Sequence, residues 1–150
     1  MTLPYKSTTS STEDTEKLGE SLAEALGADC SLPRFIALYG DLGVGKTAFV
    51  RGFTRVFAPN ASVKSPTFAL VNEYGSKDTP VYHFDMYRIV DEDDLYSTGF
   101  YDYLTGRGYC IVEWSENIPY ALPDRYIRVD IKKTSPERPD ERDVCITPKG

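Results

Sequence analysis

The run Gly40-Asp41-Leu42-Gly43-Val44-Gly45-Lys46-Thr47 decides the fold class of this chain. It matches the pattern G-x-x-x-x-G-K-[ST] at every defined position, and that pattern forms a phosphate-binding loop between a strand and a helix. The flanks agree, because residues 34–39 predict a short apolar strand and residues 48–57 predict a helix. The sequence therefore predicts an α/β domain with a site for a nucleoside triphosphate.

The residues of this P-loop have separate expected tasks. The glycines let the backbone turn tightly, so that successive N–H groups point inward at phosphate oxygens. Lys46 is expected to reach the β- and γ-phosphates, and the Thr47 hydroxyl is expected to ligate Mg²⁺. The alternative is a glycine-rich turn that contains Lys and Thr by chance. The N–H groups expected to bind phosphate are those of Asp41, Leu42, Gly43, Val44 and Gly45.

Length and composition narrow the function classes. A chain of 150 residues suits one domain, which we expect to span residues 1–150 with a loose Ser- and Thr-rich segment at 1–10. The net charge of −6 disfavours direct binding to the phosphate backbone of nucleic acid, so DNA is not an expected partner and any RNA role is indirect. Neither a signal-peptide core nor a membrane-spanning apolar run is present, so we expect a cytoplasmic protein without membrane contact.

The pattern along the chain predicts a mixed sheet. A helix is expected after Ser11, with Gly27 ending it, and a weaker acidic helix, interrupted by Gly99, is expected over 91–104. Two β-rich runs, 67–74 and 81–87, are separated by a turn and predict an antiparallel hairpin.

Further strands are expected in the second half of the chain. The apolar run 109–113 predicts a strand buried on both faces beside the P-loop strand. Residues 126–132 and 143–147 predict a closing pair across a polar loop at 134–141. We therefore expect parallel strands around the nucleotide and antiparallel strands at the hairpins, with flanking helices.

Two carboxylates end apolar runs that follow the P-loop. Glu113 ends the run 109–112, and Asp85 ends the run 81–84. A carboxylate at this end of a neighbouring strand can hold Mg²⁺ through water or orient the attacking water, as in a Walker B strand. The alternative for each residue is a strand-end carboxylate that caps the following turn.

Two threonines are candidates by their position. Thr67 follows a loop after the P-loop helix, where a switch threonine would contact the γ-phosphate or Mg²⁺; the alternative is an ordinary strand-opening Thr. Thr15, in the first expected helix, is a candidate nucleotide contact in a lid. The sequence contains no Asn/Thr-Lys-x-Asp segment of the kind that recognises guanine, so we expect ATP rather than GTP.

Three further motifs follow the P-loop in a fixed order. They are Ser65-Pro66-Thr67-Phe68, His83-Phe84-Asp85-Met86-Tyr87-Arg88 and Glu113-Trp114. Together with the P-loop this set resembles the TsaE family, over about residues 12 to 122. Generic P-loop kinases lack the combination.

The resemblance implies a small bacterial ATPase required for threonylcarbamoyladenosine at position 37 of tRNAs that read ANN codons. It implies a TsaD–TsaB pair as the partner that transfers the threonylcarbamoyl group. It also implies that Lys46 and the loop amides hold phosphate, that Thr47 and Glu113 serve the metal, and that Asp85 and Thr67 complete the γ-phosphate side. His83 occupies a family motif position, with simple packing as the alternative.

Two other functions are compatible with a P-loop. A small-molecule kinase would transfer the γ-phosphate to an acceptor, but it would need an acceptor pocket and usually an Arg-rich lid, and the sequence shows no such lid. A non-catalytic module would use ATP only to set its shape. Hydrolysis that appears only with partners would separate that module from an ATPase.

Overall fold

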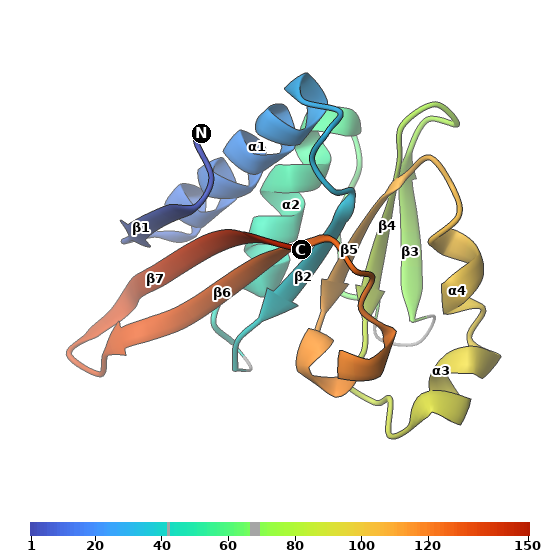
Figure 1. Ribbon diagram of the computed structural model, residues 1–150. Coiled ribbons are helices and arrows are strands. Elements are labelled where there is room, and N and C mark those ends of the chain that lie inside the picture. The colour runs from blue at the N-terminus through green and yellow to red at the C-terminus, as the bar shows by residue number, and fades with distance from the viewer. Residues whose placement is uncertain (42, 67–69) are drawn as a thin grey trace.

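The computed structural model describes residues 1–41, 43–66 and 70–150 (Figure 1). Within these ranges the chain alternates between strands and helices around one sheet. The first half contains β1 (Tyr5–Thr9), α1 (Thr12–Ala28), β2 (Phe35–Tyr39), α2 (Lys46–Phe57), β3 (Val71–Gly75) and β4 (Pro80–Asp85). The second half contains α3 (Glu92–Ser97), α4 (Phe100–Tyr103), β5 (Tyr109–Glu113), the short 3₁₀ turns η1 (Ser115–Asn117) and η2 (Pro119–Ala121), β6 (Tyr126–Ser135) and β7 (Arg138–Lys149).

The described strands form a mixed sheet in the order β1-β7-β6-β2-β5-β4-β3. The P-loop strand β2 lies between β5 and β6 and is parallel to both, and β4 is parallel to β5. The hairpin partners β3 and β7, and the edge strand β1, run antiparallel to their neighbours. This confirms the predicted α/β fold with a mixed sheet. Because the carboxyl ends of β2, β4 and β5 meet at one edge, the P-loop and both candidate carboxylates gather there.

Helices α1 and α2 cover one face of the sheet (Figure 1). Their apolar stripes pack over β2 and β6, with Leu22 and Phe53 fully buried. The two helices approach so closely that a Cβ added to Gly52 would lie 1.8 Å from the Glu16 carbonyl oxygen. Glu16 also accepts hydrogen bonds from Arg51 at 2.9 Å and Arg55 at 3.0 Å. The crossing therefore holds the P-loop helix firmly against α1.

The short helices α3 and α4, with η1 and η2, cover the other face over β5 and β4 (Figure 1). Phe35 and Phe84 from the strands pack edge-on against Phe100, at ring distances of 6.2 and 5.2 Å. The expected helix at 91–104 is thus two pieces, separated at Gly99, where the sequence places its break. No helix in the described ranges combines the length and apolar character needed to span a membrane.

The N-terminal segment differs from its prediction. Residues 1–10 were expected to be loose, yet Tyr5–Thr9 form β1 and pair in register with 142–146 of β7. Thr8 also donates a 2.8 Å hydrogen bond to Asp143. The Tyr and Thr residues of this segment favour a strand, but an edge strand that is mostly exposed shows no clear apolar pattern.

The last two strands are longer than predicted. β6 continues to Ser135 and β7 resumes at Arg138, so most of the expected loop at 134–141 is strand. The reason is that the ends of this hairpin are solvent-exposed, and polar side chains there carry no period-2 signal. Gly27 does not end α1, which continues through Ala28. The buried parallel strand Tyr109–Glu113 and the antiparallel β3–β4 hairpin are confirmed.

Candidate functional site

The P-loop joins the end of β2 to the start of α2. Gly45 is the N-cap of α2 and has φ 105°, a left-handed conformation that side chains other than glycine rarely adopt. The first turn of α2 has no side-chain cap. Free N–H groups and the helix dipole at such a start attract anions, so the loop geometry suits a phosphate group.

The side chain of Lys46 is folded back over its own loop. Its Nζ donates a 2.5 Å hydrogen bond to the Gly40 carbonyl and lies 3.7 Å from the centre of the Trp114 ring. Burial lowers the pKa of Lys46, while the nearby carboxylates of Glu116 and Glu113 act in the opposite direction. A carbonyl and an aromatic ring are weaker partners for an ammonium group than a phosphate anion. The Lys46 amine is therefore placed to exchange these contacts for phosphate oxygens.

Glu113 faces the P-loop helix from the end of β5. Its side chain is 5% exposed, and both carboxylate oxygens lie 3.4 Å from the Thr47 hydroxyl. Oε2 also lies 2.5 Å from Nε2 of the fully buried His83. Since an ionised carboxylate only accepts, the imidazole N–H is the donor in this pair. The structure thus brings together three residues that are distant in the sequence.

Asp85 sits beside Glu113 but makes other contacts. The two residues are Cα partners in the β4–β5 ladder. Oδ1 of Asp85 accepts from the Tyr87 N–H at 2.9 Å, and Oδ2 accepts from the Ser65 hydroxyl at 3.1 Å. These bonds are those of a turn-capping carboxylate, the alternative reading of this position, and they also join the turn to the Ser65 segment.

Of the three other candidate residues, the structure describes one. Thr67 and Leu42 lie outside the described residues. Thr15 is buried, and its hydroxyl lies 3.0 Å from the Thr9 hydroxyl, while a Cβ placed on Gly45 would lie 3.9 Å from its methyl group. The Thr15 methyl therefore faces the P-loop, and its hydroxyl faces β1.

The oxygen pair of Thr47 and Glu113 matches what Mg²⁺ takes from a protein. This ion usually binds one or two protein oxygens and completes its shell with water and substrate phosphates. Among the described residues no group of three or more His, Cys, Asp or Glu side chains is placed to enclose a metal by itself. The donor set present fits a magnesium ion that is shared with a nucleotide.

Sequence reasoning missed residues that tertiary structure brings to the loop. Arg142 on β7 donates from Nε to the Val44 carbonyl at 2.9 Å, and Glu116 on η1 accepts from the Gly40 N–H at 3.3 Å. Glu116 follows the Glu113-Trp114 motif closely enough to have been considered. Arg142 carries no local signal, because its position depends on the β1–β7–β6 pairing.

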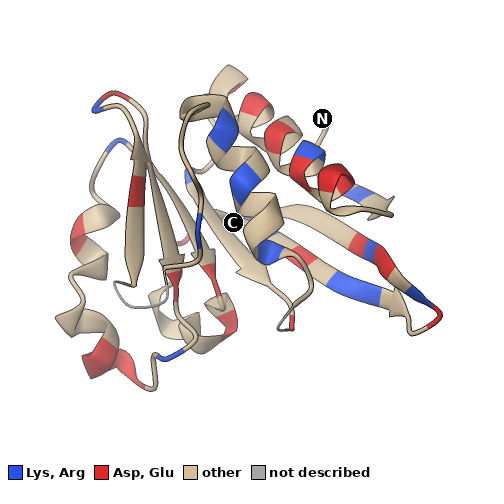
Figure 2. Cartoon of the chain, turned by 180° about the vertical axis from the view of Figure 1, so that it is seen from behind, with Lys and Arg blue, Asp and Glu red and all other residues tan. Residues whose placement is uncertain are grey.

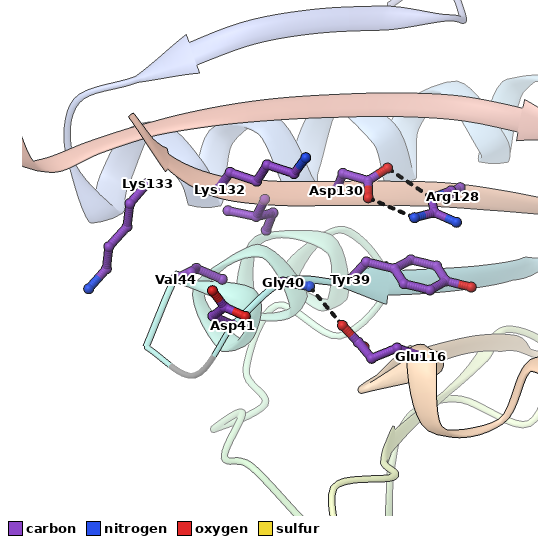
Figure 3. A pocket seen from close by; sticks show the side chains of 10 residues that line it. Tyr39, Gly40, Asp41, Val44, Glu116, Arg128, Asp130, Lys132 and Lys133 are labelled. Carbon is purple, nitrogen blue, oxygen red and sulfur yellow. Dashed lines mark hydrogen bonds and ion pairs between the residues drawn. The ribbon is translucent and has the colours of Figure 1, made fainter. Parts of the chain in front are cut away.

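A pocket of about 680 Å³ opens between the P-loop and β6 (Figure 3). On its wall the Arg128 guanidinium lies 3.8 Å from the centre of the Tyr39 ring and binds Asp130 through two hydrogen bonds of 2.9 and 3.1 Å. Lys132 and Lys133, which follow Asp130 and Ile131 on β6, also line the pocket (Figure 3). The pocket has both charged and apolar lining residues, and it borders the P-loop at Gly40, Asp41 and Val44.

Fold and loop together define a P-loop nucleotide-binding protein of the α/β class. The sequence model of the family described as "Threonylcarbamoyl adenosine biosynthesis protein TsaE" matches residues 9–144. The chain therefore belongs to the TsaE family, which takes part in threonylcarbamoyladenosine biosynthesis on tRNA. This confirms the resemblance seen in the sequence motifs.

Curated relatives and a solved structure support the assignment. The tRNA threonylcarbamoyladenosine biosynthesis protein TsaE of Bacillus subtilis is 38% identical over 115 residues, covering 77% of this chain and 70% of that protein. The protein of the same name from Rickettsia bellii is 36% identical over 133 residues, covering 88% and 89%. The crystal structure of Bacillus subtilis YdiB superposes with a TM-score of 0.73 at 29% identity, covering 100% of this chain and 88% of the other.

Proposed function

We propose that this chain is a Mg²⁺-dependent ATPase of the threonylcarbamoyladenosine pathway, slow alone and active together with a TsaD–TsaB pair in the cytoplasm. It would serve the modification of position 37 in tRNAs that read ANN codons. The observation that carries the proposal is the buried Glu113 carboxylate, held by His83 at 2.5 Å and placed 3.4 Å from the P-loop Thr47 hydroxyl. Phosphate binding alone does not require such a carboxylate.

The P-loop residues bind the triphosphate in this proposal. The N–H groups of the loop and of the first turn of α2 hold the β-phosphate, and Lys46 leaves the Gly40 carbonyl to contact the β- and γ-phosphates. Arg142 stabilises the conformation of the loop by donating a hydrogen bond to the Val44 carbonyl. These contacts position the γ-phosphate at the edge where β4 and β5 end.

Thr47 and Glu113 would hold the magnesium ion. When bound, Mg²⁺ neutralises charge on the phosphate oxygens during transfer to water. His83 keeps the Glu113 carboxylate in one orientation, because its N–H donates to Oε2. Asp85, together with Thr67, completes the γ-phosphate side and orients the attacking water, whose oxygen bonds to the γ-phosphorus as the bond to the β–γ bridging oxygen breaks.

The products would be ADP and inorganic phosphate. A kinase would instead pass the phosphoryl group to an acceptor and release no phosphate. Equal amounts of ADP and inorganic phosphate, measured in one reaction, would support the ATPase and exclude the kinase. ADP formation that needs the TsaD–TsaB pair would fit the proposal, whereas no ADP formation even with the pair would leave a non-catalytic nucleotide module.

Lys46→Ala tests the nucleotide site itself. We expect loss of tight ATP binding in calorimetry, because the substitution removes the mobile positive charge at the β- and γ-oxygens. Lys77→Ala is the matched control, since Lys77 is an exposed lysine in the β3–β4 turn. Unchanged ATP affinity in Lys46→Ala would contradict the assignment of the P-loop.

A further inference from the structure

Exposed apolar side chains gather on one part of the surface. Of the seven large hydrophobic residues exposed among the described ones, four lie around α3: Tyr87 at 56%, Val90 at 83%, Tyr96 at 75% and Tyr120 at 44%. The consecutive exposed acids Asp91, Glu92, Asp93 and Asp94 border them. We call these eight residues the α3 patch. In Figure 2, the N-terminal part of α3 is red.

Contacts join the parts of the α3 patch. The Val90 N–H donates to Asp94 at 3.2 Å, and the ring of Tyr96 lies 6.3 Å from that of Tyr101. The Asn117 side chain on η1 donates to the Met86 carbonyl at 2.9 Å and to the Tyr87 carbonyl at 3.3 Å, which ties η1 to the segment before α3. Burial, followed by Tyr101 and the carboxylate of Glu92, raises the pKa of Tyr120. The patch is therefore one surface rather than scattered side chains.

The α3 patch rests on a rigid base. Leu95 and Phe100 are fully buried beneath it, and the Asp91 side chain caps α3 by accepting from the Asp94 N–H at 2.8 Å. Clustered exposed apolar residues with a polar border mark interaction sites, and tyrosine is enriched at protein interfaces. Such a surface loses little conformational entropy when it binds.

The negative charge of the α3 patch distinguishes between an RNA partner and a protein partner. The four consecutive carboxylates repel the phosphate backbone of RNA, whereas they attract a protein surface that carries Lys and Arg. We propose that the α3 patch is the docking surface for the protein partner of this ATPase, and that the partner presents apolar pockets bordered by basic residues. This inference rests on the proposed function, because it assigns a surface to the partner named there.

The α3 patch is physically connected to the nucleotide site. The Tyr87 ring lies 5.0 Å from the Trp114 ring, whose face covers the Lys46 ammonium at 3.7 Å. The same segment is tied to β5, because the Met86 N–H donates to the Glu113 carbonyl at 3.0 Å. A partner that contacts Tyr87 is therefore separated from the Lys46 ammonium by a single side chain, the Trp114 ring. By linkage, ATP and the partner would alter each other's affinity by the same factor.

Two substitutions outside the nucleotide site test the surface. Val90→Asp and Tyr96→Ser, made singly, are assayed by calorimetry for binding to the purified TsaD–TsaB pair in the presence of ATP and Mg²⁺. We expect each to weaken binding at least about ten-fold, the loss typical of an anchor residue, without changing the affinity for ATP alone. Val56→Asp is the matched control, because Val56 is exposed (37%) on α2.

The outcomes separate this inference from the proposed function. If the Val90→Asp and Tyr96→Ser variants bound the TsaD–TsaB pair as tightly as the unmodified protein, the docking surface would be overturned while the proposed partner would stand. No binding by the unmodified protein would overturn the proposed partner and the surface with it. Binding of tRNA alone at physiological salt that is lost in Val90→Asp would assign the patch to RNA and overturn a protein partner.

The acidic border gives an independent check. Asp93→Lys should weaken binding to the pair and reduce its dependence on salt, because one attractive charge becomes repulsive. Glu24→Lys makes the same charge change on α1, away from α3. Equal salt dependence in the two variants would contradict a basic partner surface.

Discussion

The carboxyl ends of β4 and β5 lie side by side, and each carries a carboxylate, yet their environments differ. Glu113 is nearly inaccessible and faces Thr47 and His83. Asp85 is half-buried, and its carboxylate accepts hydrogen bonds from the Ser65 hydroxyl and from a backbone N–H of the next turn. The strand ends therefore place both carboxylates near the P-loop, whereas burial and hydrogen-bond donors determine which contacts each carboxylate can make.

Burial makes Glu113 depend on its neighbours. An ionised carboxylate removed from water is unfavourable unless donors or cations surround it. At this site His83 supplies a donor, and Thr47 and a shared Mg²⁺ would supply the rest. Asp85 keeps some contact with solvent and does not need a metal ion to offset its burial. Replacing the carboxylate by an amide should therefore change hydrolysis by different amounts at Glu113 and at Asp85.

The largest expected effect is that of Glu113→Gln. Hydrolysis with the TsaD–TsaB pair should fall by about 100-fold or more, the scale seen when one preorganised electrostatic group is removed, and the Mg²⁺ requirement should rise. ATP binding without metal should persist, because the P-loop holds the phosphates. Steady-state hydrolysis over a Mg²⁺ titration measures both effects. Glu24→Gln is the control, because Glu24 is exposed on α1, and equal activity in the two variants would refute the proposed metal role of Glu113.

A smaller loss is expected for Asp85→Asn. The amide oxygen can still accept from the Tyr87 N–H, so the turn after β4 should be kept, but a neutral side chain orients water less strongly. Hydrolysis should fall by less than in Glu113→Gln, with an unchanged Mg²⁺ dependence, in the same assay. If Asp85→Asn shifted the Mg²⁺ dependence as much as Glu113→Gln does, the two strand ends would share the metal.

His83 can be tested by truncation and rescue. His83→Ala leaves the buried Glu113 carboxylate without its donor, which should reduce the free energy of unfolding by about 1–3 kcal/mol and raise the Mg²⁺ requirement. His83→Gln retains an N–H donor and should restore part of the metal response. Urea unfolding and a Mg²⁺ titration separate the two readouts. A variant that loses stability but keeps the metal response unchanged would leave His83 a packing residue.

The smallest expected effect is that of Ser65→Ala, which removes one exposed hydrogen bond to Asp85. Unfolding free energy should change by no more than about 1 kcal/mol. A modest fall in hydrolysis, with unchanged ATP affinity, would show that the Ser65 segment helps to orient Asp85. A fall as large as that of Asp85→Asn would instead make Ser65 necessary for the role of Asp85.

Sequence reasoning worked best in the parallel part of the sheet. The P-loop, its flanking strand and helix, and the buried strand 109–113 follow from local patterns, because a continuous apolar run bounded by turns has few other solutions. The antiparallel strands at the β1 edge of the sheet were less predictable. These strands are polar at their ends, so β1 and the outer part of the β6–β7 hairpin show only in their pairing.

The residues of the candidate site could likewise be predicted where local motifs name them, but not where tertiary contacts do. The P-loop residues and both strand-end carboxylates could be named from motifs and spacing, and their roles remain predictions. The contacts that distinguish Glu113 from Asp85 could not be named, because they depend on which face of each strand points at α2. Arg142, which donates to the Val44 carbonyl, could not be found without the β-strand pairing.

By itself the sequence determined that this chain is a P-loop α/β protein of the TsaE type, because the loop motif and its flanks are local and each residue in them has one chemical task. Only the tertiary structure decided that Nε2 of His83 lies 2.5 Å from the Glu113 carboxylate, that Trp114 covers Lys46, and that four exposed apolar side chains lie around α3. These features join segments far apart in the chain, and strand register and side-chain packing bring such segments together.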